Sequence, residues 1–238
     1  LWKDQLRQPG VWTEGEKLTQ LTKSKEISIS PQIYVLLGQL LRRNDHDCED
    51  WLRQGHSLFP DDFWLAYTLA SELRRKGRLQ ESEGFYHAAW AIRPDSPGPL
   101  NGLGLVYKLM NDLDRAQQKF ELFLKKNPRS FVALNNLGAV AAARGEQDTA
   151  IRYYRQALAQ QEHSLPLTNL AAELMKKKQF DEAMPLLKQA IILNPKEARA
   201  HTNLGKIYSI QGDPEKAIAS YRRDIDIDAK LIEAHHNL

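Results

Sequence analysis

Residues 131–163 read FVALNNLGAVAAARGEQDTAIRYYRQALAQQEH, and this stretch decides the fold because its spacing recurs along the chain. In each copy, a leucine and a small residue precede an alanine and a large side chain at fixed distances. The three clearest copies are Leu137-Gly138 with Ala150, Tyr154 and Ala157; Leu170-Ala171 with Ala183, Leu187 and Ala190; and Leu204-Gly205 with Tyr208, Ala217 and Tyr221. The period of 33 or 34 residues is typical of repeat proteins, whose units bury their apolar faces only by stacking.

The same register divides most of the chain into six units and the start of a seventh. The units are 31–62, 63–96, 97–130, 131–163, 164–197 and 198–231, with 232–238 opening the seventh. Numbered from the first residue of a unit, places 4, 7, 8 and 11 are apolar or small, and places 20, 24, 27 and 28 repeat the spacing. Because each set forms one stripe of an α-helix, each unit is predicted to be two amphipathic helices. Small residues at places 8, 20 and 27 would let the two helices approach closely.

This pattern resembles the tetratricopeptide repeat, and the resemblance covers residues 31–231. It implies an all-α, right-handed superhelical solenoid of antiparallel helix pairs, whose concave wall is formed mainly by the first helix of each unit. Some positions depart from the pattern. Unit 31–62 is two residues short and has Cys48 at the alanine place, Glu162 stands where proline is usual, and the last unit has Asp224 at a small buried place and Ala229 for proline. We expect the second helix of that last unit to pack loosely.

Residues 1–30 do not fit the repeat. Thr13 with Glu16 predicts a capping box that opens a helix, so this segment is interpreted as an N-terminal helical cap or linker. A second resemblance offers an alternative. LWKDQLRQPGVW, SPQIYVLLGQLLRR and FPDDFWLAYTLASELRRKG are similar to the segment that joins kinase and repeats in large bacterial Ser/Thr protein kinases with tetratricopeptide tails. That resemblance implies a non-catalytic targeting tail, and a chain that starts without methionine and ends seven residues into a repeat suggests a piece of a longer protein.

Composition and motifs exclude several classes of function. A net charge of +3 is too small to imply a polyanion partner, and no run of about 18 apolar residues predicts a membrane span. The single cysteine allows no internal disulfide and favours a reducing, cytoplasmic location. We find no kinase catalytic loop, serine elbow or metal-chelating pair, and Gly102-Leu103-Gly104 lacks the third glycine of a phosphate loop. The sequence therefore predicts no enzyme activity, no metal and no cofactor, with Cys48 a small core residue.

One face of the first helices is the candidate binding surface. Places 2, 6, 9 and 13 lie opposite the buried stripe, and place 6 carries an asparagine in four successive units: Asn136, Asn169, Asn203 and Asn237. A carboxamide offers one acceptor and two donors, so this column is predicted to bond the backbone of an extended peptide. The alternative is that asparagine is simply common before Leu-Gly in this repeat.

Other side chains would add specificity to the same surface. Trp64 and Tyr67 are candidates to hold an apolar side chain of the ligand. Basic residues would favour an acidic segment; these are Arg43, Arg75, Lys176 and Lys206. Basic residues at place 13 also lie in the last turn of the first helix, where they would stabilise the helix dipole whatever binds nearby.

The resulting hypothesis is a non-catalytic protein-protein interaction scaffold that binds an extended peptide in its concave groove. The first alternative is the targeting tail of a larger enzyme, such as a bacterial Ser/Thr kinase. The second is an RNA-binding helical repeat, which the low net charge disfavours. Neither nucleic acid nor membrane is an expected partner. Self-association through exposed end helices is a further expectation, because the incomplete last repeat would expose an apolar face.

Overall fold

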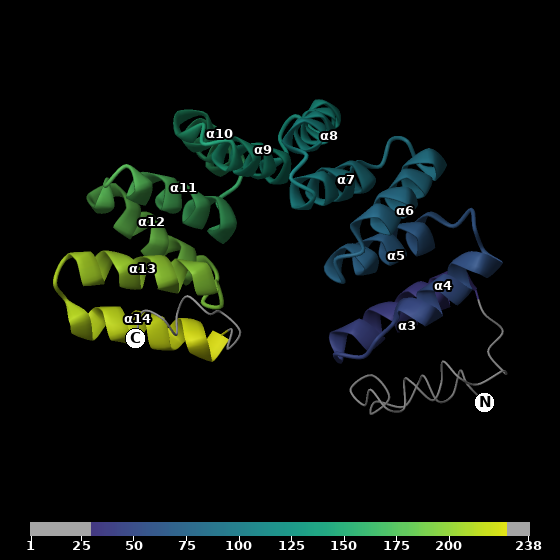
Figure 1. Ribbon diagram of the computed structural model, residues 1–238, viewed down its shortest axis with the longest axis horizontal. Helices are drawn as coiled ribbons and strands as arrows, with labels where there is room; N and C mark the ends of the chain where they lie inside the picture. The colour runs from purple at the N-terminus through teal and green to yellow at the C-terminus, as the bar shows by residue number, and fades with distance from the viewer. Residues whose placement is uncertain (1–29, 228–238) are drawn as a thin grey trace. The chain divides into compact units, whose positions relative to one another are not determined.

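The computed structural model describes residues 30–227, and the regular structure in this part of the chain is entirely α-helical (Figure 1). The helices are α3 (Pro31–Arg43), α4 (Glu49–Leu58), α5 (Phe63–Arg75), α6 (Leu79–Ile92), α7 (Pro97–Leu109), α8 (Leu113–Lys126), α9 (Phe131–Ala143), α10 (Gln147–Gln160), α11 (Ser164–Lys176), α12 (Phe180–Leu193), α13 (Ala198–Ile210) and α14 (Pro214–Ile227). Outside the described residues lie residues 1–29 of the cap predicted at 1–30, the start of a seventh unit at 232–238, Ala229 and Asn237.

Each odd-numbered helix begins at the first residue of a repeat unit, and local capping explains several of these starts. The carboxylate of Asp62 accepts a hydrogen bond from the amide of Leu65 at 2.9 Å, and the hydroxyl of Ser130 accepts one from Ala133 at 3.2 Å. These side chains satisfy amide groups that the first turn of a helix leaves without a partner. In α3 and α7, a proline in the first turn removes one such amide altogether.

Each described pair turns from its first helix to its second through one left-handed residue. These residues, all with φ between 59° and 79°, are Asp45, Gly77, Asn111, Gly145, Lys178 and Gly212. Glycine adopts this conformation without strain, whereas the Cβ of lysine opposes it. Gly77, Gly145 and Gly212 therefore suit these turns because of their backbone conformation.

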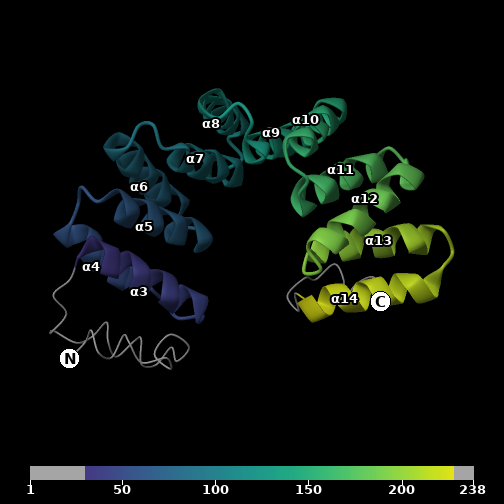
Figure 2. The same ribbon diagram turned by 180° about the vertical axis from the view of Figure 1, so that it is seen from behind.

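The chain divides into two compact units, residues 1–119 and 120–238, which we call the N-terminal half and the C-terminal half. In the N-terminal half, α3 packs on α4 and α5 on α6, around a core that includes Leu37, Leu52 and Leu69. In the C-terminal half, α9 packs on α10, α11 on α12 and α13 on α14. Figures 1 and 2 show these pairs from opposite sides.

Small residues set the distance between the helices of a pair, as the register predicts. A Cβ added at Gly138 would lie 2.6 Å from the ring of Tyr154, and one added at Gly205 would lie 2.6 Å from Tyr221. The alanines at places 20 and 27, such as Ala150 and Ala157, are completely buried. A larger side chain at these positions would separate the two helices or force the tyrosine to move.

Two of the departures from the repeat pattern, Cys48 and Asp224, are accommodated within the core. Cys48 is 1 % exposed in the place of an alanine, and burial raises the pKa of its thiol to about 11. Asp224 is completely buried and accepts a hydrogen bond from the hydroxyl of Thr202 in α13. Ala217 and Tyr221 of α14 are also buried, so the expectation that this helix packs loosely is wrong. A hydrogen bond from the facing helix lets an aspartate occupy the small buried place.

Candidate functional site

Two adjoining pockets open on the surface of the C-terminal half. The first, of about 430 Å³, is lined by Ala139, Ala142, Tyr154, Asn169, Ala172, Glu173, Arg199, Thr202 and Asn203. The second, of about 650 Å³, is lined by Ala172, Met175, Lys176, Lys178, Phe180, Asn203, Lys206, Ser209, Ile210 and Tyr221. They share Ala172 of α11 and Asn203 of α13. The predicted site residues Asn169, Asn203, Lys176 and Lys206 all lie on this surface.

A chain of polar side chains crosses the first pocket from α9 to α13. The side-chain nitrogen Nδ2 of Asn169 donates a hydrogen bond to the side-chain oxygen of Asn135 at 2.9 Å. The carboxamide oxygen of Asn169 in turn accepts a hydrogen bond from the guanidinium of Arg199. These two bonds fix the orientation of the Asn169 side chain and leave its second N–H to offer to a ligand.

The acidic residue of the first pocket is Glu173 of α11, which is only 4 % exposed. One of its carboxylate oxygens, Oε1, accepts from the ammonium of Lys176 at 2.7 Å. The other oxygen, Oε2, is buried without a hydrogen-bond partner. A buried acceptor without a hydrogen bond costs free energy, so an additional hydrogen bond to this carboxylate would be favourable.

Two hydroxyl groups complete the first pocket. Burial raises the pKa of Tyr154 well above its usual range, the charge of Glu173 raises it further, and the charge of Arg199 opposes the change. The phenol therefore stays protonated and remains able to donate. The hydroxyl of Thr202 donates to the buried carboxylate of Asp224 and is held in place by that bond.

The second pocket combines an apolar floor with a basic rim. Met175, Phe180 and Ile210 contribute apolar surface, and three lysines contribute positive charge: Lys176, Lys178 and Lys206. No aspartate or glutamate lines this pocket. Its chemistry suits an apolar side chain flanked by an acidic one.

In the N-terminal half, Trp64 is exposed, whereas Tyr67 is half-buried among other aromatic rings. Trp64 is 49 % exposed and lines a pocket of about 310 Å³ between α3 and the start of α5. Tyr67 is half-buried, with its ring 5.8 Å from that of Phe63 and edge-on to Tyr86. A Cβ added at Gly98 would lie 3.1 Å from the Tyr67 ring, so this tyrosine packs against α7 as well.

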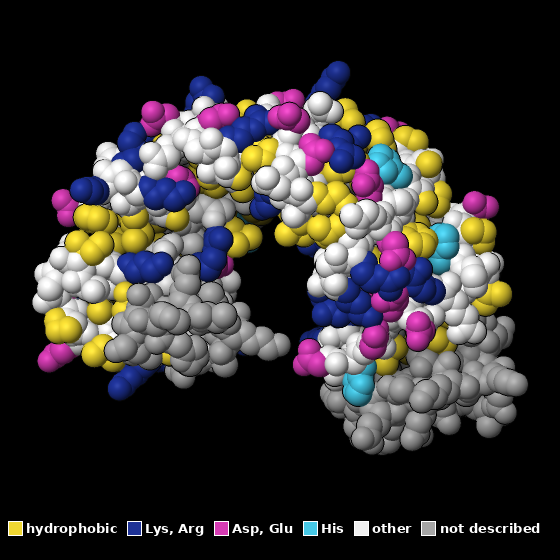
Figure 3. Space-filling view, viewed as in Figure 1, with side chains coloured by type: hydrophobic (Ala, Val, Ile, Leu, Met, Phe, Trp, Pro, Cys, Tyr) yellow, Lys and Arg dark blue, Asp and Glu magenta, His cyan; other side chains and the backbone are white. Residues whose placement is uncertain are grey.

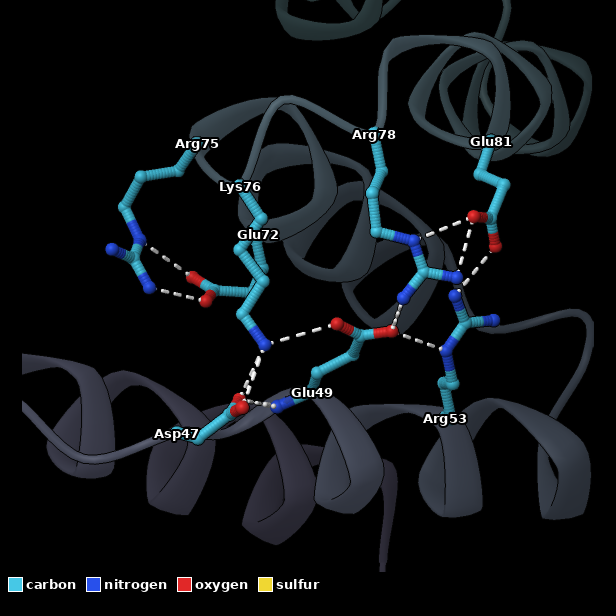
Figure 4. Close-up of polar contacts among 8 residues, drawn as sticks. All are labelled: Asp47, Glu49, Arg53, Glu72, Arg75, Lys76, Arg78 and Glu81. Carbon is cyan, nitrogen blue, oxygen red and sulfur yellow. Dashed lines mark hydrogen bonds and ion pairs between the residues drawn. The ribbon is translucent and has the colours of Figure 1, made fainter.

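Charged residues of the N-terminal half are joined in ion pairs rather than forming an open basic patch (Figure 4). The guanidinium of Arg75 binds both oxygens of Glu72, at 3.1 and 2.5 Å. Close by, Glu49 accepts from Lys76 at 3.0 Å and from Arg53 at 2.8 Å. Figure 3 shows basic and acidic side chains adjoining on this part of the surface. Arg75 and Arg43 are both exposed, but the guanidinium of Arg75 is bonded to a buried acid, whereas Arg43 lies in the last turn of α3.

The pairing of basic residues at place 13 with glutamates at place 10 was missed in the sequence. Glu72 pairs with Arg75, and Glu173 pairs with Lys176, three residues further along the same helix. The signal was present, because the other described units have an apolar residue at place 10: Leu40, Val106, Val140 and Ile207. A glutamate that replaces an apolar residue three positions before a basic one predicts a buried ion pair.

Comparison with known proteins places these features in a family. Two family models, each described as a tetratricopeptide repeat, match residues 101–164 and 174–238, which together are more than half of the chain. The chain belongs to the tetratricopeptide repeat family. Its fold is the all-α tetratricopeptide solenoid that the sequence predicts.

Relatives of known sequence match this tetratricopeptide protein over part of their length. It is 28% identical over 160 residues to a TPR repeat-containing protein of Pseudomonas aeruginosa, covering 65% of this chain and 27% of that one. It is 26% identical over 165 residues to the human cell division cycle protein 16 homolog, covering 65% and 26%. The match thus spans about a quarter of each relative. Among solved structures, a tetratricopeptide repeat protein from Parabacteroides merdae superposes with a TM-score of 0.82 at 16% identity, covering 100% of this chain and 94% of that one.

The asparagine column at place 6 is less uniform in the tetratricopeptide array than its spacing suggests. Asn169 and Asn203 are partly exposed and line the first pocket. Asn136 is 9 % exposed and lines neither of the two pockets described above. At the same place, Gly102 is buried because the ring of Tyr86, from the preceding unit, occupies the space that a Cβ would fill. The exposure of place 6 therefore differs from one unit to the next.

None of the described helices of this tetratricopeptide protein is long and apolar enough to cross a membrane.

Proposed function

We propose that this tetratricopeptide protein is a non-catalytic scaffold that binds an extended segment of a partner protein on the surface of its C-terminal half. The observation that supports the proposal is the pair of adjoining pockets on α11 and α13, which share Asn203 and bring two place-6 carboxamides to one surface. Pockets with a few polar groups set among apolar walls are typical ligand sites.

The chemistry of the two pockets suggests how a peptide would lie. Asn169 and Asn203 would bond its backbone, since each retains hydrogen-bonding capacity toward the first pocket. The second pocket would take an apolar side chain, with Lys178 and Lys206 attracting an acidic neighbour. The pocket beside Trp64 is a separate candidate for an apolar anchor in the N-terminal half. The buried thiol of Cys48 fits the cytoplasmic location that is part of this proposal.

The proposal is tested with peptides selected from a random dodecapeptide display library on the purified chain. The double variant Asn169→Ala/Asn203→Ala should bind the selected peptides at least about tenfold more weakly, because it loses both carboxamides. The matched control is Gln156→Ala/Gln160→Ala, which removes two exposed carboxamides from α10, outside both pockets. Circular dichroism must show equal helicity. Equal affinity of the wild type and the asparagine variant, or a library that yields no peptide, would contradict the proposal.

Two alternative functions are separated by other measurements. A kinase tail requires catalytic-loop motifs in the reading frame upstream of Leu1. An RNA-binding array would lose affinity steeply as salt increases, because bound phosphates release counterions. We favour peptide binding over RNA because Glu173 lines the first pocket and would repel a phosphate.

A further inference from the structure

We infer that the first pocket receives a lysine or arginine side chain of the partner segment, with Glu173 as its counter-charge. This inference rests on the proposed function, because it specifies one residue of the peptide that the groove would bind. Four observations carry it: the hydrogen bonding of the carboxylate, a saturated glutamate at the equivalent place, the walls of the pocket, and the distribution of charge.

The first observation is an acid that is incompletely satisfied inside the protein. Lys176 reaches Oε1 of Glu173 and leaves Oε2 buried without a hydrogen-bond partner. Lys76 bonds both oxygens of Asp47, but the ammonium of Lys176 reaches only one oxygen of Glu173, whereas a guanidinium presents two parallel donors to a carboxylate. The terminal torsion of glutamate is soft, so a partial rotation of the Glu173 carboxylate would turn its unpaired oxygen toward the pocket. An additional donor would therefore find an acceptor whose desolvation has already occurred in folding.

The second observation is that the same repeat place holds a saturated glutamate elsewhere in the chain. Glu72 is 1 % exposed and occupies place 10 of its unit, as Glu173 does. Both of its oxygens are bonded by Arg75, which stands at place 13 as Lys176 does. The repeat geometry thus allows a guanidinium to close this acid completely. In unit 164–197, the ammonium of Lys176 leaves one oxygen of Glu173 without a hydrogen bond.

The third observation concerns the walls, which suit the aliphatic stem of a long basic side chain. Ala139, Ala142 and Ala172 present small apolar surfaces, and Tyr154 adds an aromatic ring beside the carboxylate. Lysine and arginine bury their methylene groups on such surfaces while the charged end reaches an acid or an aromatic face. A pocket of about 430 Å³ is large enough for one such side chain and the backbone on either side of it.

The fourth observation is that the acids near the pocket are buried and the bases are exposed. Glu173 and Asp224 are 4 % and 0 % exposed, and Asp224 lies behind Thr202 of the pocket wall. Lys176 and Arg199 carry the opposite charge, but the Lys176 side chain is 55 % exposed and Arg199 is also exposed. Water and salt screen exposed charges more than buried ones. The interior of the pocket therefore attracts a cation although the charges around it balance.

The deciding variant is Lys176→Arg, which supplies Glu173 with the guanidinium that Glu72 already has. It keeps the charge and the helix, and it should occupy the second oxygen. The probes are N-acetylated dodecapeptides chosen from the random library on the wild-type chain. We expect these peptides to share a lysine or arginine at one position, and replacement of that residue by norleucine should weaken binding at least about tenfold. Lys176→Arg and Glu173→Gln should each weaken binding to a similar extent, whereas Arg75→Lys in the N-terminal half should leave binding unchanged.

Other outcomes separate this inference from the proposed function. Peptides that need Asn169 and Asn203 but share no basic position would overturn the inference and leave the groove function intact. Wild-type affinity in Lys176→Arg would do the same. Binding only by peptides with a free amino terminus would show that the cation is a terminal ammonium, which also overturns the inference as stated. A library that yields no peptide would overturn both.

Discussion

Two buried glutamates at the same repeat place differ in hydrogen bonding between the two halves of the molecule. Both carboxylate oxygens are bonded in the N-terminal half, and one is left without a partner in the C-terminal half. Glu72 and Glu173 both stand where the other described units have an aliphatic residue, and both are nearly inaccessible. Arg75 bonds both oxygens of Glu72, whereas Lys176 bonds one oxygen of Glu173. Burial is therefore set by the repeat, but hydrogen-bond saturation is set by the residue at place 13.

The largest effect on stability should follow from removing Arg75, the partner of Glu72. Arg75→Ala leaves a buried carboxylate with no counter-charge and should lower the free energy of unfolding by about 3 kcal/mol. Lys176→Ala should cost less, about 2 kcal/mol, because Glu173 loses one bond and already has an unpaired oxygen. Urea unfolding followed by circular dichroism, with hydrogen exchange read separately in α5 and α11, measures the two effects. Equal losses, or a larger loss for Lys176→Ala, would contradict this account of the difference.

The next effect concerns acid and Glu49, which forms a separate cluster of ion pairs with Arg53, Lys76 and Arg78. Burial raises the pKa of Glu49, but hydrogen bonds from Arg53 and Lys76 outweigh burial and lower that pKa to about 2. A folded-state pKa below the unfolded value of about 4.5 stabilises the protein above pH 4.5, and this stability is lost as the pH falls toward 2. The full contribution is roughly 3 kcal/mol, of which about 2 kcal/mol is lost by about pH 3.

Hydrogen exchange in α4 and α5 between pH 5 and about pH 3 would measure this loss. Glu49→Gln should be less stable at neutral pH and should show a smaller loss over the same range. An unchanged acid response in Glu49→Gln would assign the effect to other carboxylates.

A reciprocal exchange should give smaller shifts of opposite sign. Lys176→Arg should stabilise α11 by about 1 kcal/mol, because the guanidinium reaches the unpaired oxygen of Glu173. Arg75→Lys should destabilise α5 by a similar amount, because one oxygen of Glu72 would lose its hydrogen bond. Thermal unfolding of the two variants and of the double exchange measures the shifts. The double variant should lie near the wild type, since the two sites are in different halves. Shifts of the same sign would contradict the comparison.

The smallest effect should appear where a basic residue at place 13 has no acid at place 10. Arg43 follows Leu40 at that spacing, so within residues 30–227 we expect the helix dipole to be the main interaction that favours its charge. Arg43→Ala should cost about 0.3 kcal/mol, and high salt should remove most of that cost. A loss as large as that of Arg75→Ala, measured by the same urea unfolding, would reveal a partner for Arg43 and remove the distinction drawn here.

Much of the fold could be predicted from the sequence because the same pattern of apolar and small residues occurs in several units. Every described unit repeats the stripe, so a departure such as Cys48 in one copy does not obscure the others. The helix starts also follow from local signals such as Asp62 and Ser130. Less could be predicted about which faces are buried. A stripe at places 4, 7, 8 and 11 describes a helix covered on one side, whereas each inner helix of an array is covered by its partner and by neighbouring units.

The candidate site illustrates that limit. Place 10 is buried in five of the six described units, and place 6 is buried at Gly102 by a tyrosine of the preceding unit. Asn136, Asn169 and Asn203 share one place in the repeat, yet only the latter two line the first pocket. Spacing gives the angle of a side chain around its own helix, but the side chains that cover it come from other units. The hydrogen bonds among Asn135, Asn169 and Arg199 are of this kind.

The choice between lysine and arginine beside a buried glutamate also has an evolutionary consequence. The codons AAA and AAG for lysine become AGA and AGG for arginine by a change of one base. Such a substitution in this array would preserve net charge, helix propensity and core packing, so selection for folding would scarcely oppose it. Recognition by a repeat could thus be gained or silenced in one mutational step, and duplicated units could diverge in their ligands while the scaffold stayed the same.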